Sequence, residues 1–113
     1  ENFIYQSSES LKKYNKNVSI VNFGHLGDNN LHFNVCIDES LNKKQFEGFK
    51  KNVNEIIFSN VKKFNGSISA EHGIGQLRKD ELKKYKSLEE IQRMKKIKKI
   101  FDPKNIMNPG KVL

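Results

Sequence analysis

Two histidines stand seven residues apart on either side of a glycine-rich turn, and a carboxylate and a third histidine follow about forty residues later. The first pair is His25 and His32, and the second is Glu71 and His72. Two imidazoles and a carboxylate form a ligand set that leaves positions on a divalent metal open to a substrate. A third imidazole beside such a metal would have its charged form disfavoured and could accept a proton. The pattern therefore indicates a metal site with a general base beside it.

Each of these residues also has a simpler interpretation. A histidine near a strand is commonly a surface or packed residue, Glu71 could neutralise nearby lysines, and His72 could hydrogen-bond locally. We favour metal ligation because the first two histidines occupy mirrored positions around a turn. Glu71 in addition precedes a glycine turn, where the backbone can approach a ligand closely. Asn34, two residues beyond His32, could donate to a substrate carboxylate or orient an imidazole.

Two predicted strands must carry the histidine pair. Residues 18–23 are rich in β-branched and apolar side chains, and residues 31–37 alternate between apolar and polar ones, as half-buried strands do. Residues 27–30 between them tolerate positive φ and favour a turn. In an antiparallel hairpin around this turn, His25 would stand about opposite His32, with Cβ atoms roughly 5 Å apart on one side of the sheet. We therefore expect both imidazoles to reach one metal ion, provided that the register does not slip.

Amphipathic helices are predicted to cover one face of this sheet. Residues 41–64 have helical apolar spacing, with Asp38 or Ser40 as the cap and a left-handed Gly66 at the end. Residues 1–15 could form another helix. A capping box of Ser87 and Glu90 begins a last helix, which stops before Pro103. The apolar residues expected to be buried on the two longer helices are Phe46, Phe49, Val53, Ile56, Ile57, Val61 and Phe64, and Leu88, Ile91, Met94, Ile97 and Phe101.

The remaining segments complete the expected fold. Residues 66–70 are predicted to form a short strand, residues 71–75 a turn and residues 105–111 an irregular turn. Strands followed by helix, strand and helix predict an α+β fold, an antiparallel sheet with amphipathic helices packed on one face. We expect residues 1–113 to form a single domain, because a chain of this length buries one modest core.

The composition limits the classes of function. No apolar run is long enough to span a membrane, and the N-terminal residues lack the form of a signal peptide. Cys36 is the only cysteine, which rules out an internal disulfide and suggests a reducing compartment. We expect a cytoplasmic protein, or a mitochondrial one in a eukaryote.

The net charge of +8 is carried mainly by pairs of lysines on the expected outer faces of helices. A solvated surface explains them, and a positive field that attracts small anions or nucleic acid is the alternative. Nucleic-acid modules usually bring arginines or exposed aromatic residues to their patches. The only arginines are Arg78 and Arg93, so we expect no nucleic-acid partner.

Three segments, residues 24–32, 69–75 and 101–111, resemble the C-terminal motifs of the FAD-linked oxidases with a vanillyl-alcohol-oxidase-type fold. The run His25-Leu26-Gly27-Asp28-Asn29-Asn30-Leu31-His32-Phe33-Asn34-Val35 is most similar to D-2-hydroxyacid dehydrogenases of the D-2-hydroxyglutarate type. Asn29 stands where those relatives usually have glycine, but asparagine also tolerates positive φ. Ala70 stands where many relatives have glycine. Neither departure removes a proposed ligand.

The resemblance implies a role for each chemical group. His25, His32 and Glu71 would ligate a divalent metal, with zinc as the first candidate, and His72 would take the hydroxyl proton of the substrate. The implied enzyme oxidises a D-2-hydroxy acid, of the D-2-hydroxyglutarate or D-lactate type, to the 2-oxo acid and transfers a hydride to FAD.

Two further roles follow from the same resemblance. Asn34 would contact the substrate, and Asn108, in the terminal Asn-Pro-Gly-Lys turn, would touch the flavin. The sequence does not choose among D-2-hydroxyglutarate, D-lactate, glycolate and longer hydroxy acids.

Such enzymes bind FAD mainly in an N-terminal domain, and nothing in this chain resembles it. We therefore expect the C-terminal part of the cap domain of a longer FAD-dependent enzyme, inactive by itself. Its partners would be a small 2-hydroxy acid, the FAD-binding domain of the same protein and an unidentified electron acceptor. An exposed apolar face could also cause self-association.

Two other functions compete with this interpretation. A basic module that binds nucleic acid or acidic partners would explain the charge, but it leaves the histidines and Glu71 without a purpose. A metal-dependent hydrolase would use the same ligands to activate water.

Overall fold

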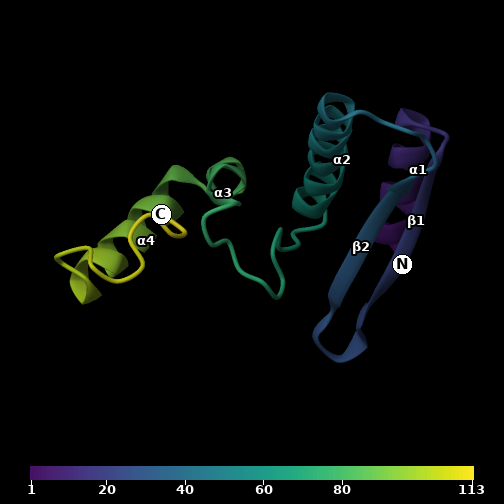
Figure 1. The fold of residues 1–113 in the computed structure, drawn as a ribbon. Helices are drawn as coiled ribbons and strands as arrows, with labels where there is room; N and C mark the ends of the chain where they lie inside the picture. The colour runs from purple at the N-terminus through teal and green to yellow at the C-terminus, as the bar shows by residue number, and fades with distance from the viewer. The chain divides into compact units, whose positions relative to one another are not determined.

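A two-stranded antiparallel hairpin forms the sheet of the first part of the chain (Figure 1). In the computed structural model, which describes residues 1–113, the strands are β1 (Val18–His25) and β2 (Asn30–Ile37). A short 3-10 turn, η1 (Leu26–Asp28), joins them. The predicted antiparallel pair is confirmed, and it reaches further toward the turn than the sequence indicated. The hairpin therefore includes both His25 and His32.

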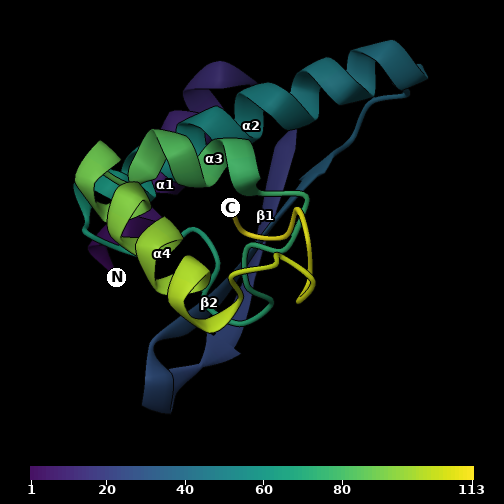
Figure 2. The ribbon, with the colours of Figure 1, turned by 90° about the vertical axis from the view of Figure 1, so that its left-hand side faces the viewer.

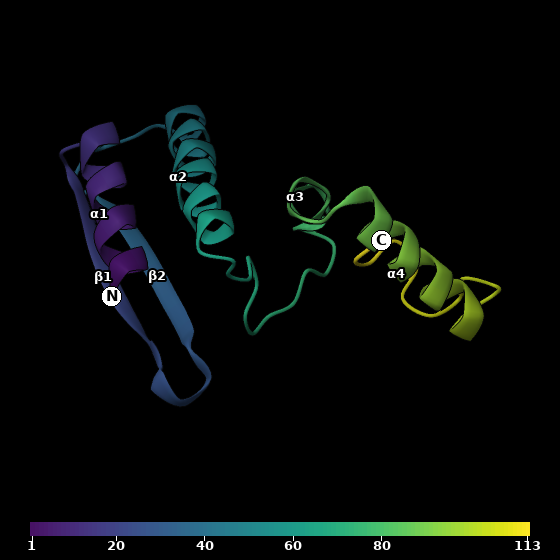
Figure 3. The ribbon, with the colours of Figure 1, turned by 180° about the vertical axis from the view of Figure 1, so that it is seen from behind.

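Two helices, α1 (Asn2–Tyr14) and α2 (Lys43–Lys63), pack on one face of the hairpin. Figure 3 shows α1 in front of the strands with α2 beside it. This arrangement confirms the α+β fold with helices on one face of an antiparallel sheet. The buried core consists of Leu11 of α1, Val18 of β1, and Phe49 and Val53 of α2. Alternation explains why the strands take part, since every second side chain faces the helices.

Three phenylalanines link the end of α2 to the middle of β2. The ring of Phe3 meets those of Phe33 and Phe64 edge-to-face, with centroids 5.9 and 5.8 Å apart. Phe33 adjoins His32 in sequence, so the end of α2 is held close to the strand position that carries His32. The turn end of the hairpin extends beyond both helices, as Figure 2 shows from the side.

The first turn of α2 is capped by Asn42, and the prediction of Asp38 or Ser40 as its cap was wrong. The Asn42 side chain accepts the Gln45 N–H, and the Gln45 side chain accepts the Asn42 N–H, both at 3.0 Å. This reciprocal pair satisfies two amide groups that a helix start leaves without partners. The cap position depends on where the chain turns into the helix, and several asparagine, aspartate and serine residues compete for it.

The C-terminal end of α2 is closed by a left-handed asparagine. Asn65 has φ 53°, whereas Gly66, predicted to be left-handed, does not have positive φ. The Asn65 N–H donates to the Lys62 carbonyl at 3.0 Å, and the Gly66 N–H donates to the Val61 carbonyl at 2.8 Å. These two bonds form a Schellman motif with asparagine at its left-handed position.

Residues 66–70 do not form the predicted strand. The sheet contains only β1 and β2, so no ladder partner is present for this segment. A β-strand needs a neighbouring strand to complete its backbone hydrogen bonds, and the β-propensity of a segment does not provide that neighbour.

The chain forms two compact units, which we call the N-terminal unit (Glu1–Ser67) and the C-terminal unit (Ile68–Leu113). The C-terminal unit contains α3 (Lys79–Tyr85), which the sequence analysis did not predict, and α4 (Leu88–Phe101). The predicted capping box of α4 is confirmed, with the Ser87 side chain accepting the Glu90 N–H at 3.2 Å. The helix ends at Phe101, as predicted from the following Asp102 and Pro103.

Burial of the helical apolar residues differs from the prediction. No residue of α4 is buried: Leu88, Ile97 and Phe101 are exposed, and Ile91 and Met94 are half-buried. On α2, Phe46 is likewise exposed. Periodicity fixes which side chains share a face, but burial requires an opposing surface that a helix alone does not specify. None of the helices has the length and apolar character that crossing a lipid bilayer demands.

Candidate metal and substrate site

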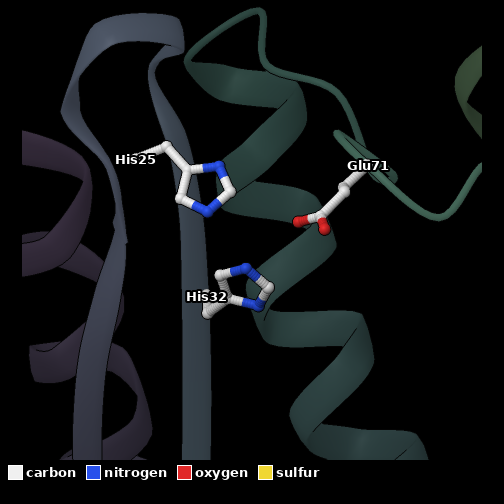
Figure 4. Close-up of side chains that lie close together, drawn as sticks. All are labelled: His25, His32 and Glu71. Carbon is white, nitrogen blue, oxygen red and sulfur yellow. The ribbon is translucent and has the colours of Figure 1, made fainter.

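The register of the hairpin places His25 and His32 on one face of the sheet, but not opposite each other. His25 pairs with Asn30, and His32 pairs with Phe23. The expectation that the two histidines would be cross-strand partners was therefore wrong by two residues, since the partner of His25 is Asn30 and not His32. Because Phe23 and His25 lie two residues apart on β1, the imidazoles are diagonal neighbours on the same face (Figure 4). A diagonal pair remains within reach of long or ring-shaped side chains.

The two imidazoles have a geometry that suits a shared cation. Their ring centroids are 6.0 Å apart and their planes are inclined by 68°. Two imidazoles that bind one zinc ion at about 2.0–2.1 Å have ring centroids on the order of 5–6 Å apart. His25 is exposed and His32 is half-buried, so solvent and small ions can reach the pair. The donor chemistry and spacing of the pair therefore fit a divalent metal.

The turn beside His25 is organised by Asp28. One carboxylate oxygen of Asp28 accepts the Asn30 N–H at 3.3 Å, and the other lies 3.7 Å from Nδ1 of His25. Nδ1 of His25 thus faces a carboxylate, which leaves Nε2 as the nitrogen available to a cation. Asn29 adopts the left-handed conformation, with φ 54° and ψ 31°. The expected tolerance of positive φ at Asn29 is confirmed, and so is the turn-forming role of Asp28.

A stacked aromatic pair lies beside the imidazoles, and the sequence analysis did not identify it. The Phe23 ring lies parallel to that of His32, with centroids 4.8 Å apart and an interplanar angle of 7°. Phe23 is nevertheless 55% exposed. The signal was present in the sequence, since alternation along Val21, Phe23 and His25 puts all three on one face.

Asn34 shares the face of His32, as predicted. It pairs with Val21 across the hairpin and is exposed. It lies two residues along β2 from His32, a separation of about 7 Å for extended chain. An amide at this distance can contact a small molecule that is held at the imidazoles.

Glu71 and His72 lie in the first loop of the C-terminal unit, and both are exposed. The Ser69 hydroxyl donates to the Gly73 carbonyl at 2.7 Å and closes the loop around them. Gly73 has φ 72°, a conformation that side chains with a Cβ rarely adopt. The tight loop therefore directs an adjacent carboxylate and imidazole outward. Glu71, labelled in Figure 4, offers a carboxylate oxygen as a ligand atom.

A type II turn carries Asn108. The Lys111 N–H donates to the Asn108 carbonyl at 3.2 Å, with Pro109 and left-handed Gly110 (φ 71°) between them. Proline followed by a left-handed glycine is the preferred sequence of such a turn. The side chain of Asn108 is exposed.

Hydrogen bonds tie this tail to the loop of His72 within the C-terminal unit. The Val112 N–H donates to the Gly75 carbonyl at 2.7 Å. The Lys79 ammonium donates to the carbonyls of Gly110 at 3.1 Å and Leu113 at 2.8 Å. Two regions more than thirty residues apart in sequence, one with His72 and one with Asn108, are therefore brought together.

A buried carboxylate supports the start of the same tail. Asp102 is 5% exposed and accepts the N–H groups of Ile106 and Met107 at 2.9 and 3.0 Å. Its other partner is the ammonium of Lys98. The Lys98 hydrogen bond, helped by the two backbone donors, holds the pKa of Asp102 below its ordinary value.

The six residues predicted from sequence thus fall into two groups. His25, His32 and Asn34 share one face of the hairpin in the N-terminal unit. Glu71, His72 and Asn108 belong to the loop and tail of the C-terminal unit.

The chain is similar in sequence to known proteins. Residues 1–112 match the family described as FAD linked oxidases, C-terminal domain. The chain is similar to a D-2-hydroxyglutarate dehydrogenase of Stutzerimonas stutzeri, with 50% identity over 93 residues, which are 82% of this chain and 20% of the relative. It is 37% identical over 110 residues to the D-2-hydroxyglutarate dehydrogenase of Xanthomonas citri pv. viticola, covering 97% of this chain and 23% of that protein.

A D-lactate dehydrogenase of Archaeoglobus fulgidus is 38% identical over 108 residues, which are 96% of this chain and 23% of the relative. The chain therefore spans about a fifth of the length of the curated relatives that it matches.

Proposed function

The chain belongs to the family of FAD linked oxidase C-terminal domains, and from this premise we propose that it is the metal- and substrate-binding part of a flavin-dependent D-2-hydroxyacid dehydrogenase. The reaction is the oxidation of a D-2-hydroxy acid to the 2-oxo acid. The observation that carries this proposal is the pair of imidazoles on the exposed face of the hairpin, spaced for one cation, with Asn34 on the same face. Relatives named for D-2-hydroxyglutarate and for D-lactate support the substrate class.

Glu71 is the proposed third metal ligand. The chain leaves the N-terminal unit at Ser67, only four residues before Glu71, and four residues of extended chain span at most about 14 Å. The end of α2 is in turn held beside Phe33 through the ring of Phe3. The covalent connection therefore limits how far the Glu71 carboxylate can lie from the last residue of the N-terminal unit.

In the proposed chemistry the metal, the flavin and the protein side chains each have a separate role. When bound, a divalent cation such as zinc supplies a Lewis acid that lowers the pKa of the substrate hydroxyl, and FAD accepts the hydride. His72 accepts the hydroxyl proton, since a neutral imidazole is a base suited to neutral pH. Asn34 holds the substrate by hydrogen bonding, and Asn108 contacts the flavin from the terminal turn.

FAD binding and turnover are proposed to need protein beyond these residues. The matched relatives are about five times as long as the aligned region, and the family is that of a C-terminal domain. We propose that the 113-residue chain alone neither retains FAD nor turns over substrate. Flavin retention with turnover by this chain alone would contradict the proposal.

Calorimetric titration with zinc tests the metal site directly. We expect one ion to bind per chain and His32→Ala to remove that binding. His72→Ala is the matched control, because it deletes an exposed imidazole that is not a proposed ligand, and its zinc affinity should stay within about two-fold of the parent. Zinc binding that survives His32→Ala would contradict the ligand assignment.

A chimeric enzyme tests the reaction. The aligned 93 residues of the Stutzerimonas stutzeri relative would be replaced by those of this chain, and flavin absorbance would be followed without oxygen after addition of D-2-hydroxyglutarate or D-lactate. Bleaching of the flavin band is expected with at least one of them, and the same chimera with His72→Ala should bleach at least about 100-fold more slowly. A chimera that binds FAD but is reduced by neither acid would contradict the proposed function.

A further inference from the structure

We propose that Phe23 is a positioning residue for metal binding, which holds the plane of the His32 imidazole so that its nitrogen stays directed toward the cation shared with His25. This inference rests on the metal site of the proposed function and adds a residue to it. Phe23 has no donor atom, so its contribution must act through His32.

The contact between Phe23 and His32 follows from the register of β1 and β2. Phe23 and His32 are direct cross-strand partners in β1 and β2, and direct partners on one face have Cβ atoms within about 5.5 Å. The rings are almost parallel, at 7°, with centroids 4.8 Å apart. At this centroid distance the two nearly parallel rings are offset, so the phenyl ring covers part of one face of the imidazole.

The consequence for ligation follows from the shape of imidazole. A ring nitrogen binds a metal through a lone pair that lies in the ring plane, so rotation about the last side-chain torsion swings the lone pair away. That torsion has broad minima in histidine, and a free ring on an open strand face would sample them. The stack of Phe23 restricts this rotation, while the centroid of the His25 ring stands 6.0 Å from that of His32 at a steep angle.

The exposure of Phe23 argues against a role in the core. Its side chain is 55% exposed, and it points away from the face that packs against α1 and α2, where Phe33 and Val35 lie. Val21, two residues earlier on the same face, is exposed to the same degree, at 54%, but stacks on no ring. Val21 thus provides a matched apolar control on the same strand.

Zinc titration of the 113-residue chain and its variants tests the inference. Phe23→Leu keeps the apolar bulk and removes the ring, and we expect zinc affinity to fall about five-fold, equivalent to on the order of 1 kcal/mol. Phe23→Tyr keeps the stack and should restore affinity to within about two-fold. Val21→Ala should also remain within two-fold of the parent.

A second measurement follows the ring itself without metal. The His32 ring stacks on the phenyl ring, so the resonances of its carbon-bound protons should be shifted by the aromatic ring current in the parent and in Phe23→Tyr. The shift should vanish in Phe23→Leu, and the cross-strand contacts between the β1 and β2 backbones should persist.

The outcomes separate this inference from the function on which it rests. Zinc affinity unchanged in Phe23→Leu, with binding still abolished by His32→Ala, would overturn the role of Phe23 alone. A parent chain that binds no zinc, or whose binding His32→Ala leaves intact, would overturn the proposed metal site and the role of Phe23 with it. Equal losses in Phe23→Leu and Val21→Ala would also overturn the inference, because general damage to the strand would then explain them.

Discussion

In the N-terminal unit the candidate ligands His25 and His32 lie on strands that pack against an apolar core, whereas in the C-terminal unit His72 and Asn108 lie in turns tied by polar contacts. The first unit buries Leu11, Val18, Phe49 and Val53 together. The second buries only one apolar residue, Leu82, and one carboxylate, Asp102.

This difference teaches that the two groups of candidate residues respond to different disturbances. Apolar burial contributes roughly 1.5–3 kcal/mol per large side chain and is insensitive to salt and pH, so the hairpin should be damaged by cavities and by changes of register. Turns held by carboxylates, ammonium groups and carbonyls depend on protonation and on individual hydrogen bonds. The tail of Asn108 should therefore be damaged by acid.

The largest effect is expected from a cavity in the core of the N-terminal unit. Leu11 is completely buried, so Leu11→Ala should lower the free energy of unfolding by about 3 kcal/mol. Urea unfolding followed by circular dichroism would measure it. Leu26→Ala is the control, because Leu26 is 96% exposed, and a loss as large as that of Leu11→Ala would contradict the assignment of the core.

A smaller loss is expected when the hairpin is forced apart at Gly24. A Cβ at this residue would lie 2.0 Å from the Asn30 carbonyl oxygen, so Gly24→Ala should cost about 2 kcal/mol and weaken zinc binding by displacing the strand of His25. Gly27→Ala is the matched control in the same hairpin, since a Cβ there has no atom within 4 Å. Equal stability of the two variants in urea would show that the strands do not approach as described.

The left-handed turn residue should have an effect of about half that size. Asn29 has φ 54°, so Asn29→Ala should cost about 1 kcal/mol, while Asn29→Gly should be neutral or slightly stabilising. Thermal unfolding of both variants would measure the difference. Greater stability of the alanine variant than of the glycine variant would be incompatible with the left-handed turn.

The smallest effect on the whole chain should arise from acid, and it should be confined to the C-terminal unit. The folded pKa of Asp102 lies below its unfolded value, mainly because of Lys98. Its stabilising contribution is therefore complete above the unfolded pKa of about 3.9 and is lost as pH falls through the folded pKa. Amide exchange at Ile106 and Met107, corrected for intrinsic rates, should accelerate below about pH 4, with amides of the N-terminal core unchanged.

Two carboxamide variants control for this acid effect. Asp102→Asn should produce the same loss of tail protection already at neutral pH, because the amide cannot replace the carboxylate toward Lys98. Asp80→Asn, at an exposed ion pair with Lys83, should leave the tail protected. Protection of Ile106 and Met107 that survives both acid and Asp102→Asn would refute the role of this carboxylate.

Much of the site could be predicted because its signals are local. The capping box at Ser87 and Glu90 was recognised from four consecutive residues, and the alternation of β2 placed His32 and Asn34 on one face. The left-handed Asn29 followed from the tolerance of asparagine for positive φ. In each case the residues that cause the feature lie within a few positions of one another.

Other features were not predicted. The cap of α2 is Asn42, whose partner Gln45 is local, but Asp38 and Ser40 are alternative caps nearby, and where the chain turns into the helix selects among them. The expected strand over residues 66–70 has no neighbour to complete a ladder, and the apolar face of α4 has no buried residue. In these cases the local pattern indicates a preferred strand or an apolar helix face, but it does not indicate which other element will pair with the strand or cover the face.

The sequence by itself determined the chemical groups of this protein, the start of α4 with its capping box at Ser87 and Glu90, and the face of each strand. Only the tertiary structure decided that His25 and His32 are diagonal neighbours, that Phe23 stacks on His32, and that the tail of Asn108 is tied to the loop of His72. The physical reason is that side-chain direction follows from backbone periodicity within one element. Register and docking are instead set by hydrogen bonds and packing between elements, where a shift of one pair changes which side chains meet.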